Sequence, residues 1–228
     1  MYHILRQPRF IFANDWDTIM TLSYFTRLTS QQPIEITLTK IVGKTKNPNN
    51  VQMNTLAARK WYAKGNKAKG DNIKKMHLPA FAPAAILVDG KKKDHVIDLT
   101  GICFIDIDHI TESDAEQTVK ALSEDPHTLF ASISLSGKGV HLLVRYKIDF
   151  SDYDYPFISS PDKLRKLYKK VFLNLAKHYT EKLGFQVDMS GVNAERLCLI
   201  AHDPNVYYNG ESEQYVYDIT NNQITNIS

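Results

Sequence analysis

The order of hydrophobic segments in the second half of the chain restricts the fold more than any other feature. Residues 101–108 form an apolar run that is typical of a largely buried strand and that ends in two acids. Further segments follow with strand-like or helix-like spacing. The predicted order is strand, helix, strand, strand, helix and strand, at residues 101–108, 113–124, 129–134, 140–146, 161–183 and 196–201.

Local signals support the two predicted helices. Ser113-Asp-Ala-Glu has the spacing of a capping box and indicates the start of the first helix. Ser160 and Pro161 provide a cap and a proline at the first position of the second, and Gly184 is expected to end it. The whole order is the split βαβ pattern of RRM-like folds, so we expect an α+β protein with an antiparallel sheet and helices on one face.

The first half of the chain has a different pattern. Residues 34–39 alternate with a period of two and predict a strand, and residues 47–50 predict a turn. Leu56, Ala57 and Trp61 suggest the apolar side of an amphipathic helix over residues 51–64. Loop residues fill the stretch 65–71. We therefore expect a basic N-terminal α/β subdomain, residues 1–95, packed against an RRM-like catalytic subdomain, residues 96–228.

Composition indicates an ordinary globular protein. Of the 228 residues, 43% are hydrophobic and 23% are charged, and no apolar run approaches the ~18 residues needed to cross a membrane. The first residues lack the long apolar stretch of a secretory signal, so none is expected. Cys103 and Cys198 both lie in apolar stretches, where buried thiols are the favoured interpretation. We expect a cytoplasmic protein with no membrane partner.

Charge is strongly segregated along the chain. Residues 40–93 contain 13 Lys and Arg and only two acids, a local net charge of +11. Residues 94–228 contain 12 basic and 20 acidic residues, a local net charge of −8. The basic part suggests a polyanion as a partner, although a basic surface that only keeps the protein soluble stays an alternative.

Asp106 and Asp108 are the first candidate site residues. They are two residues apart on a predicted strand, so both carboxylates leave the same face of the sheet. Two like charges at this spacing repel each other, and a divalent cation between them removes that repulsion. Plain acids at a strand end are the alternative, because the pattern by itself is short.

A second candidate group is the turn Ser134-Leu-Ser-Gly-Lys-Gly and the strand that follows it. Gly137 and Gly139 permit a tight turn with amides that face outward, where an anion can bind. Ser134, Ser136, Lys138 and the nearby His141 add further groups for a phosphate. The turn is not a P-loop, because no Gly-Lys-Ser/Thr begins a helix.

Asp188 completes the candidate set. It follows Val187 at the junction after the long predicted helix, and Arg196 comes eight residues later. Alone, Asp188 is typical of a loop acid. With the other two acids and His141, it forms a set suited to metal and phosphate.

These motifs resemble those of a known group of enzymes. In order, Phe104-Ile-Asp-Ile-Asp, Ser134-Leu-Ser-Gly-Lys-Gly-Val-His and Val187-Asp resemble the three motifs of the archaeo-eukaryotic primase superfamily, which includes primase-polymerases. Residues 74–81, 101–108 and 196–204 look like the VirE N-terminal-like branch of Bacteroidetes mobile elements. Members of that branch often carry lysine where this chain has His141.

The resemblance implies a replication nucleotidyltransferase. Asp106, Asp108 and Asp188 would hold two Mg²⁺ or Mn²⁺ ions, which activate the 3′-hydroxyl and neutralise the triphosphate. His141 would contact the incoming nucleotide, and Arg196 would clamp a phosphate or a metal ligand. Template binding is expected from the lysines of the basic region, among them Lys74, Lys75, Lys91, Lys92 and Lys93.

The partners that the resemblance implies are single-stranded or primed DNA, nucleoside triphosphates, and a downstream helicase or helical primase domain. Three alternatives remain open. The chain can be a nucleic-acid-binding replication module without catalysis, since fold alone does not give activity. It can also be a metal-dependent nuclease, or a rolling-circle initiator with Tyr168 as nucleophile. The last needs a His-x-His pair, which His141-Leu-Leu does not supply.

Overall fold

A computed structural model describes residues 21–149, 160–220 and 223–226. Residues 1–20, on which the expected absence of a secretory signal depends, lie outside this part of the chain. The central sheet is built on β8, which pairs antiparallel with β6 on one side and β7 on the other. Helix α4 connects β6 to β7, which gives a split βαβ unit around β8. The bounds are β6 Ile102–Asp108, α4 Glu112–Ser123, β7 Thr128–Ile133 and β8 Gly139–Asp149.

Three further strands extend the central sheet to six. Strand β10 (Tyr207–Tyr208) pairs with β7, and β11 (Gln214–Asp218) runs parallel to the end of β8. Strand β12 (Gln223–Asn226) pairs with β11. All pairs in this sheet except β8–β11 are antiparallel.

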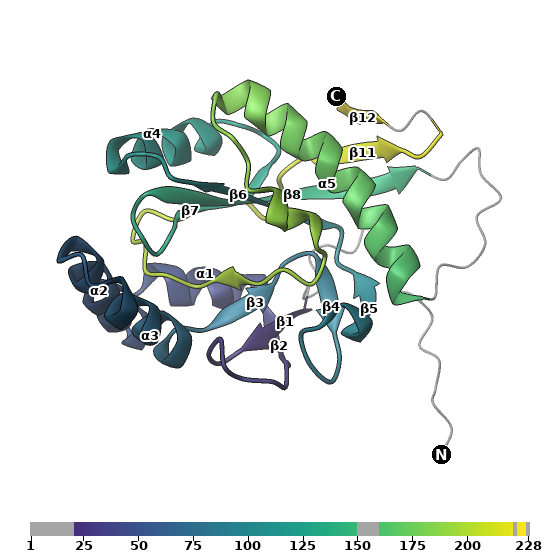
Figure 1. The fold of residues 1–228 in the computed structure, drawn as a ribbon. Coiled ribbons are helices and arrows are strands. Elements are labelled where there is room, and N and C mark those ends of the chain that lie inside the picture. The colour runs from purple at the N-terminus through teal and green to yellow at the C-terminus, as the bar shows by residue number, and fades with distance from the viewer. Residues whose placement is uncertain (1–20, 150–159, 221–222, 227–228) are drawn as a thin grey trace, which may run out of the picture.

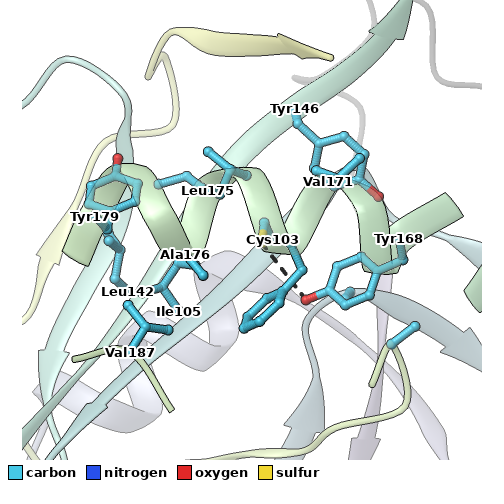
Figure 2. Packing of buried hydrophobic residues seen from close by; sticks show 14 of the residues in the cluster. Cys103, Ile105, Leu142, Tyr146, Tyr168, Val171, Leu175, Ala176, Tyr179 and Val187 are labelled. Atoms are coloured by element: carbon cyan, nitrogen blue, oxygen red, sulfur yellow. Dashed lines mark hydrogen bonds between the residues drawn. The ribbon is translucent and has the colours of Figure 1, made fainter. Parts of the chain in front are cut away.

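Helix α5 (Pro161–Leu183) lies with α4 over one face of the central sheet (Figure 1). The predicted cap is confirmed, because the Ser160 hydroxyl accepts a hydrogen bond from Lys163 N, and Gly184 ends the helix with a left-handed φ of 73°. Figure 2 shows the packing of α5 on the sheet, which includes the side chains of Cys103, Ile105, Leu142, Tyr168, Val171, Leu175, Ala176 and Tyr179. Among the helices of the described segments, none combines the length and the apolar character of a membrane span.

A second sheet covers the opposite face of the central sheet, together with three helices (Figure 1). Its strand order is β2-β1-β3-β9. The bounds are β1 Thr21–Phe25, β2 Ile34–Thr37, α1 Leu38–Lys46, α2 Asn50–Ala63, α3 Lys67–His77, β3 Ala80–Ala82 and β9 Cys198–Leu199. A small sheet and two short helices complete the fold: β4 Ala85–Leu87, η1 Lys93–His95, β5 Val96–Leu99 and η2 Met189–Val192.

The α+β class predicted from the sequence is confirmed, but the last predicted strand is misplaced. Strand β9 is shorter than the expected 196–201, and it pairs with β3 of the second sheet. Its apolar residues are buried in the core between the two sheets, which explains the location. Beside β6, Val187 makes a single antiparallel bridge to Ile107 instead.

Three local predictions are corrected by the structure. The capping box of α4 consists of Thr111 and Asp114, not of Ser113 and the glutamate three residues later. The Thr111 hydroxyl accepts from Asp114 N at 3.0 Å, and the Asp114 carboxylate accepts from Thr111 N at 3.3 Å. Because this pair satisfies amides of the first turn, the helix begins earlier than predicted.

The predicted loop at 65–71 is also wrong, because α3 begins at Lys67. The Asn66 side chain accepts from Lys69 N at 3.1 Å and caps the helix. Gly70 lies directly under the ring of Tyr62, where a Cβ atom would come within 2.3 Å of that ring. This close packing of α3 on α2 outweighs the weak helix propensity of the glycine.

The buried side of α2 also differs from the prediction. Leu56 is 55% exposed, whereas Val51, Thr55 and Ala58 face the core. The Thr55 hydroxyl accepts a hydrogen bond from His202 N at 2.9 Å. The polar Thr55 is therefore buried, whereas the pattern of hydrophobic residues predicts that Leu56 is. Tertiary contacts therefore set the rotation of α2.

Candidate metal centre

Three carboxylates converge beside the end of β6, as the sequence predicts. Asp106 and Asp108 leave the same face of this strand, and Asp188 follows α5. The backbone places Asp188 there, because its N–H donates to the Asp106 carbonyl at 2.7 Å next to the bridge between Val187 and Ile107. One oxygen from each of the three acids lies within 4.8 Å of the others.

The surroundings of Asp106 suit a cation. Asp106 is only 6% exposed, and its Oδ1 atom is buried without a hydrogen-bond partner among the described residues. Burial raises the pKa of Asp106 to about 6. Burial and the nearby charge of Asp106 also raise the pKa of Asp108. An unsatisfied buried carboxylate oxygen is costly, and three hard oxygen donors match Mg²⁺ or Mn²⁺, so these residues fit such an ion.

Arg196 offsets part of this negative charge. Its Nη2 atom lies 3.2 Å from Asp188 Oδ2 and 3.8 Å from Asp106 Oδ2. Burial alone would raise the pKa of Asp188, but hydrogen bonds from the Ser190 N–H and hydroxyl, together with Arg196, lower it. Asp188 is therefore fully charged and fixed in place at neutral pH.

His141 lies in the same place, on β8 opposite Asp106. Its Nδ1 atom is 3.5 Å from the Cys198 sulfur, and its Nε2 atom is 3.7 Å from Asp106 Oδ1, beyond hydrogen-bond length. Burial lowers the pKa of His141 to about 4. The imidazole is therefore neutral at neutral pH and can act as a hydrogen-bond donor, not as a cation. Cys198 is a contact that sequence reasoning missed, since nothing in the sequence links it to His141.

The glycine-containing turn between β7 and β8 lies against the acids. A Cβ atom at Gly139 would approach the Ile107 carbonyl to 2.5 Å and Asp108 Oδ1 to 2.9 Å. Two of the turn amides do not face outward as expected: Gly137 N donates to the Ser134 carbonyl, and Lys138 N donates to the Ser136 hydroxyl. The exposed Ser136 and Lys138 side chains, rather than an open ring of amides, are therefore the groups this turn presents.

Arg59 of α2 holds this turn, and the sequence gives no sign of that role. Its Nε and Nη2 atoms donate to the carbonyls of Leu135 and Ser134, each at 3.0 Å. Half-burial lowers the pKa of Arg59, while the charges of Asp203 and Glu112 act against this. A guanidinium remains protonated in spite of such shifts. Arg59 therefore ties the basic helices to the turn beside the acids.

The close approach at Gly139 leads to a stability prediction. Gly139→Ala is expected to lower the free energy of unfolding by about 1–3 kcal/mol, because the added methyl group meets backbone and carboxylate atoms that cannot easily move. Gly43→Ala is the control. It lies inside α1 with only Asn47 Nδ2 near a Cβ atom, at 3.8 Å, so alanine is expected to raise stability by about 0.5–1 kcal/mol. Urea unfolding of both variants measures the two effects, and equal changes would contradict this packing argument.

The predicted nucleic-acid-binding lysines lie in two separate places. Lys74 of α3 is close enough to the site for its charge to lower the pKa of both Asp106 and His141, and Lys75 follows it on the exposed side of the helix. Lys91, Lys92 and Lys93 belong to the connection between β4 and β5, which lies toward the opposite end of the molecule from the β7–β8 turn (Figure 1).

The Lys91 ammonium is engaged with other parts of the chain. It donates to the carbonyls of Leu28 and Ser30 and lies over the Phe25 ring. Lys92 and Lys93 are exposed. The structure thus brings Lys74 to the acids but places the 91–93 run elsewhere.

Comparison with known proteins gives one match. Residues 73–208 match the family described as BT4734-like, N-terminal domain. This range contains the three acids, His141 and Arg196. No curated protein and no solved structure matched the chain. Since the matched residues make up more than half of the sequence, this chain belongs to the family of BT4734-like N-terminal domains.

Proposed function

We propose that this protein is a metal-dependent nucleotidyltransferase of the primase-polymerase type, which adds nucleotides to a 3′-hydroxyl as a template directs. The observation that carries the proposal is the convergence of Asp106, Asp108 and Asp188, with His141 beside them, around a buried carboxylate oxygen that has no hydrogen-bond partner in the described part of the chain. The ordered resemblance of the three motifs to the archaeo-eukaryotic primase superfamily supports the same assignment. Mg²⁺ or Mn²⁺ at this place would supply Lewis-acid stabilisation of the reacting phosphate and activation of the hydroxyl.

Each side chain of the site has a defined task in this proposal. The three acids hold the cation, and the hydrogen bonds that Ser190 donates fix Asp188 for that role. The neutral His141 donates a hydrogen bond to a phosphate oxygen. Arg196 lies between two acids and limits their repulsion, and its planar group suits a phosphate oxygen as well.

The turn residues complete the proposed nucleotide site. Ser136 and Lys138 are exposed on the turn, and Ser134 Oγ lies 3.1 Å from Ser136 Oγ. Gly137 and Gly139 permit the tight turn that sets these groups next to Asp108. Lys138, on the turn that lies against Asp108, is expected to neutralise the outer charge of a nucleoside triphosphate. Single-stranded or primed DNA is the proposed template, in replication of DNA or of a mobile element.

The test is incorporation of labelled nucleotide by the unmodified protein. Primed and unprimed single-stranded templates are incubated with Mg²⁺ or Mn²⁺ and all four ribo- or deoxyribonucleotides, and products are resolved by length. Elongated, template-complementary products are expected. Asp162→Asn, an exposed acid on α5, serves as a control that should extend like the wild type. Template binding without extension under every condition would favour a non-catalytic module, and shortened products would indicate a nuclease.

A further inference from the structure

We infer that helices α2 and α3 carry a binding site for single-stranded nucleic acid centred on Trp61. The site is the Trp61 surface, formed by Lys60, Trp61, Lys64, Lys67 and Lys69. The use of the bound strand as a template rests on the proposed function, whereas the binding itself does not. This surface lies outside the acid cluster and the turn described above.

Trp61 has the surroundings of a stacking platform. Its ring is partly exposed near the end of α2, and two ammonium groups lie over it. Lys69 Nζ is 4.1 Å from the ring centre and Lys64 Nζ is 5.5 Å away. An aromatic ring next to two cations offers one partner for a base and another for the adjoining phosphate, which is how sequence-independent single-strand sites are built.

The charge of this region is one-sided. Residues 38–77, which include α1, α2 and α3, contain ten Lys and Arg and one acid, Asp71. That acid accepts a hydrogen bond from the Tyr62 hydroxyl at 2.9 Å. A net charge of +9 over three neighbouring helices favours a polyanion as the ligand.

Two of these lysines lie at the end of a helix where the helix dipole disfavours positive charge. Basic residues in the last turn of a helix, such as Lys74 and Lys75, interact favourably with the helix dipole. Lys67 and Lys69 instead occupy the first turn of α3, where a positive charge is unfavourable and no acid is present. The helix dipole therefore does not explain either lysine. Lys69 is held over the Trp61 ring, and a bound phosphate would give both charges a favourable partner.

The exposed side of α2 also suits unpaired bases. Met53 is 63% exposed and Leu56 is 55% exposed, and both share a helix face with Lys60. Apolar side chains and the partly exposed Trp61 ring can contact bases only where these are unstacked. A base-paired duplex presents mainly phosphate to a surface, so the combination favours single strands.

The Trp61 surface is coupled to the acid cluster through the same two helices. Two residues before Trp61, Arg59 reaches the opposite way to the β7–β8 turn, and Lys74 of α3 lies near Asp106. Figure 1 shows α2 and α3 at the end of the molecule where the β7–β8 turn also lies. A nucleic-acid strand that is bound along α2 and α3 is therefore directed toward the three clustered acids.

The experiment measures binding of a fluorescein-labelled 20-nucleotide oligo(dT) by anisotropy, in EDTA and without nucleotides. Trp61→Ala is expected to weaken binding about tenfold, and Trp61→Phe is expected to restore most of it, since phenylalanine keeps a stacking face. Lys64→Glu combined with Lys69→Glu should lower the salt slope of log Kd by about one to two units. Lys169→Glu combined with Lys170→Glu is the matched control, with the same charge change at two exposed positions of α5 over the opposite face of the central sheet, and should weaken binding far less.

Several outcomes would overturn the inference. They are wild-type binding by both the Trp61→Ala and the Lys64/Lys69 variants, an equal loss in the Lys169/Lys170 control, and equal affinity for a duplex of the same length or for poly-glutamate. The exposed lysine pair keeps the test valid even if Trp61→Ala does not fold. A protein that binds oligo(dT) as expected but extends no primer would refute the proposed function and would still support the Trp61 surface as a binding site. Failure of the proposed function and failure of this inference can therefore be distinguished.

Discussion

Asp106→Asn is expected to reduce nucleotide incorporation by at least about a hundred- to a thousandfold. The change is nearly isosteric, but it removes the charge of the most buried of the three clustered acids. Phosphoryl transfer depends mainly on positioning and electrostatic stabilisation, so little else in such a site can compensate. Primer extension with Mn²⁺, compared with Asp162→Asn, measures the loss.

The same substitution is expected to leave the fold intact. At pH 8 the Asp106 carboxylate is charged although burial raises its pKa to about 6, so without metal the charged form costs stability in the folded state. The neutral amide removes that cost, and the Tm in EDTA should hold or rise. Oligo(dT) binding should also survive, because the basic helices provide it. A fall in Tm with unchanged extension would mean that Asp106 is structural.

Phe172→Ala is expected to lower the free energy of unfolding by about 3–5 kcal/mol. The Phe172 ring is fully buried between α5 and the central sheet. A Cβ atom at Gly191 would lie 2.5 Å from Phe172 Cε2, so the ring packs directly on η2, the turn that follows Asp188. Alanine leaves a cavity that this close-packed interior cannot fill.

The neighbouring Leu173 provides the matched control, because it lies on the other side of α5 and is 41% exposed. Leu173→Ala should change stability by about 0.5 kcal/mol or less. Urea unfolding monitored by circular dichroism gives both values. Equal, small losses in the two variants would show that α5 does not pack on the sheet as described.

Much of the candidate site was predictable because the chain brings it together through short-range patterns. Asp106 and Asp108 are two apart on one strand, and a strand of alternating residues sends both to one face. The hairpin turn fixes the register of β8 against β7, which pairs His141 with Ser132. The separate pairing of β8 with β6 sets His141 opposite Asp106, and no local pattern predicts it. Asp188 was harder, since its place depends on the single bridge of Val187 beside β6.

Other features depend on contacts between distant segments and have no local signal. Arg59 donates to two backbone carbonyls about 75 residues away. The sequence does not distinguish it from a helical arginine that makes no such contact. The start of α3 depends on Gly70 fitting under Tyr62. Strand β9 joins the second sheet because its apolar residues are buried there, although their pattern suits either sheet.

Asp106, Asp108 and Asp188 are proposed to hold the divalent cation with which a nucleotide reacts. Anomalous scattering from a crystal soaked with Mn²⁺ and a nucleoside triphosphate tests this proposal most directly. We expect a manganese peak among the three carboxylates, at about 2.1 Å from their oxygens, with the triphosphate next to His141. A crystal that binds manganese or nucleotide only elsewhere, with the three acids empty, would contradict it.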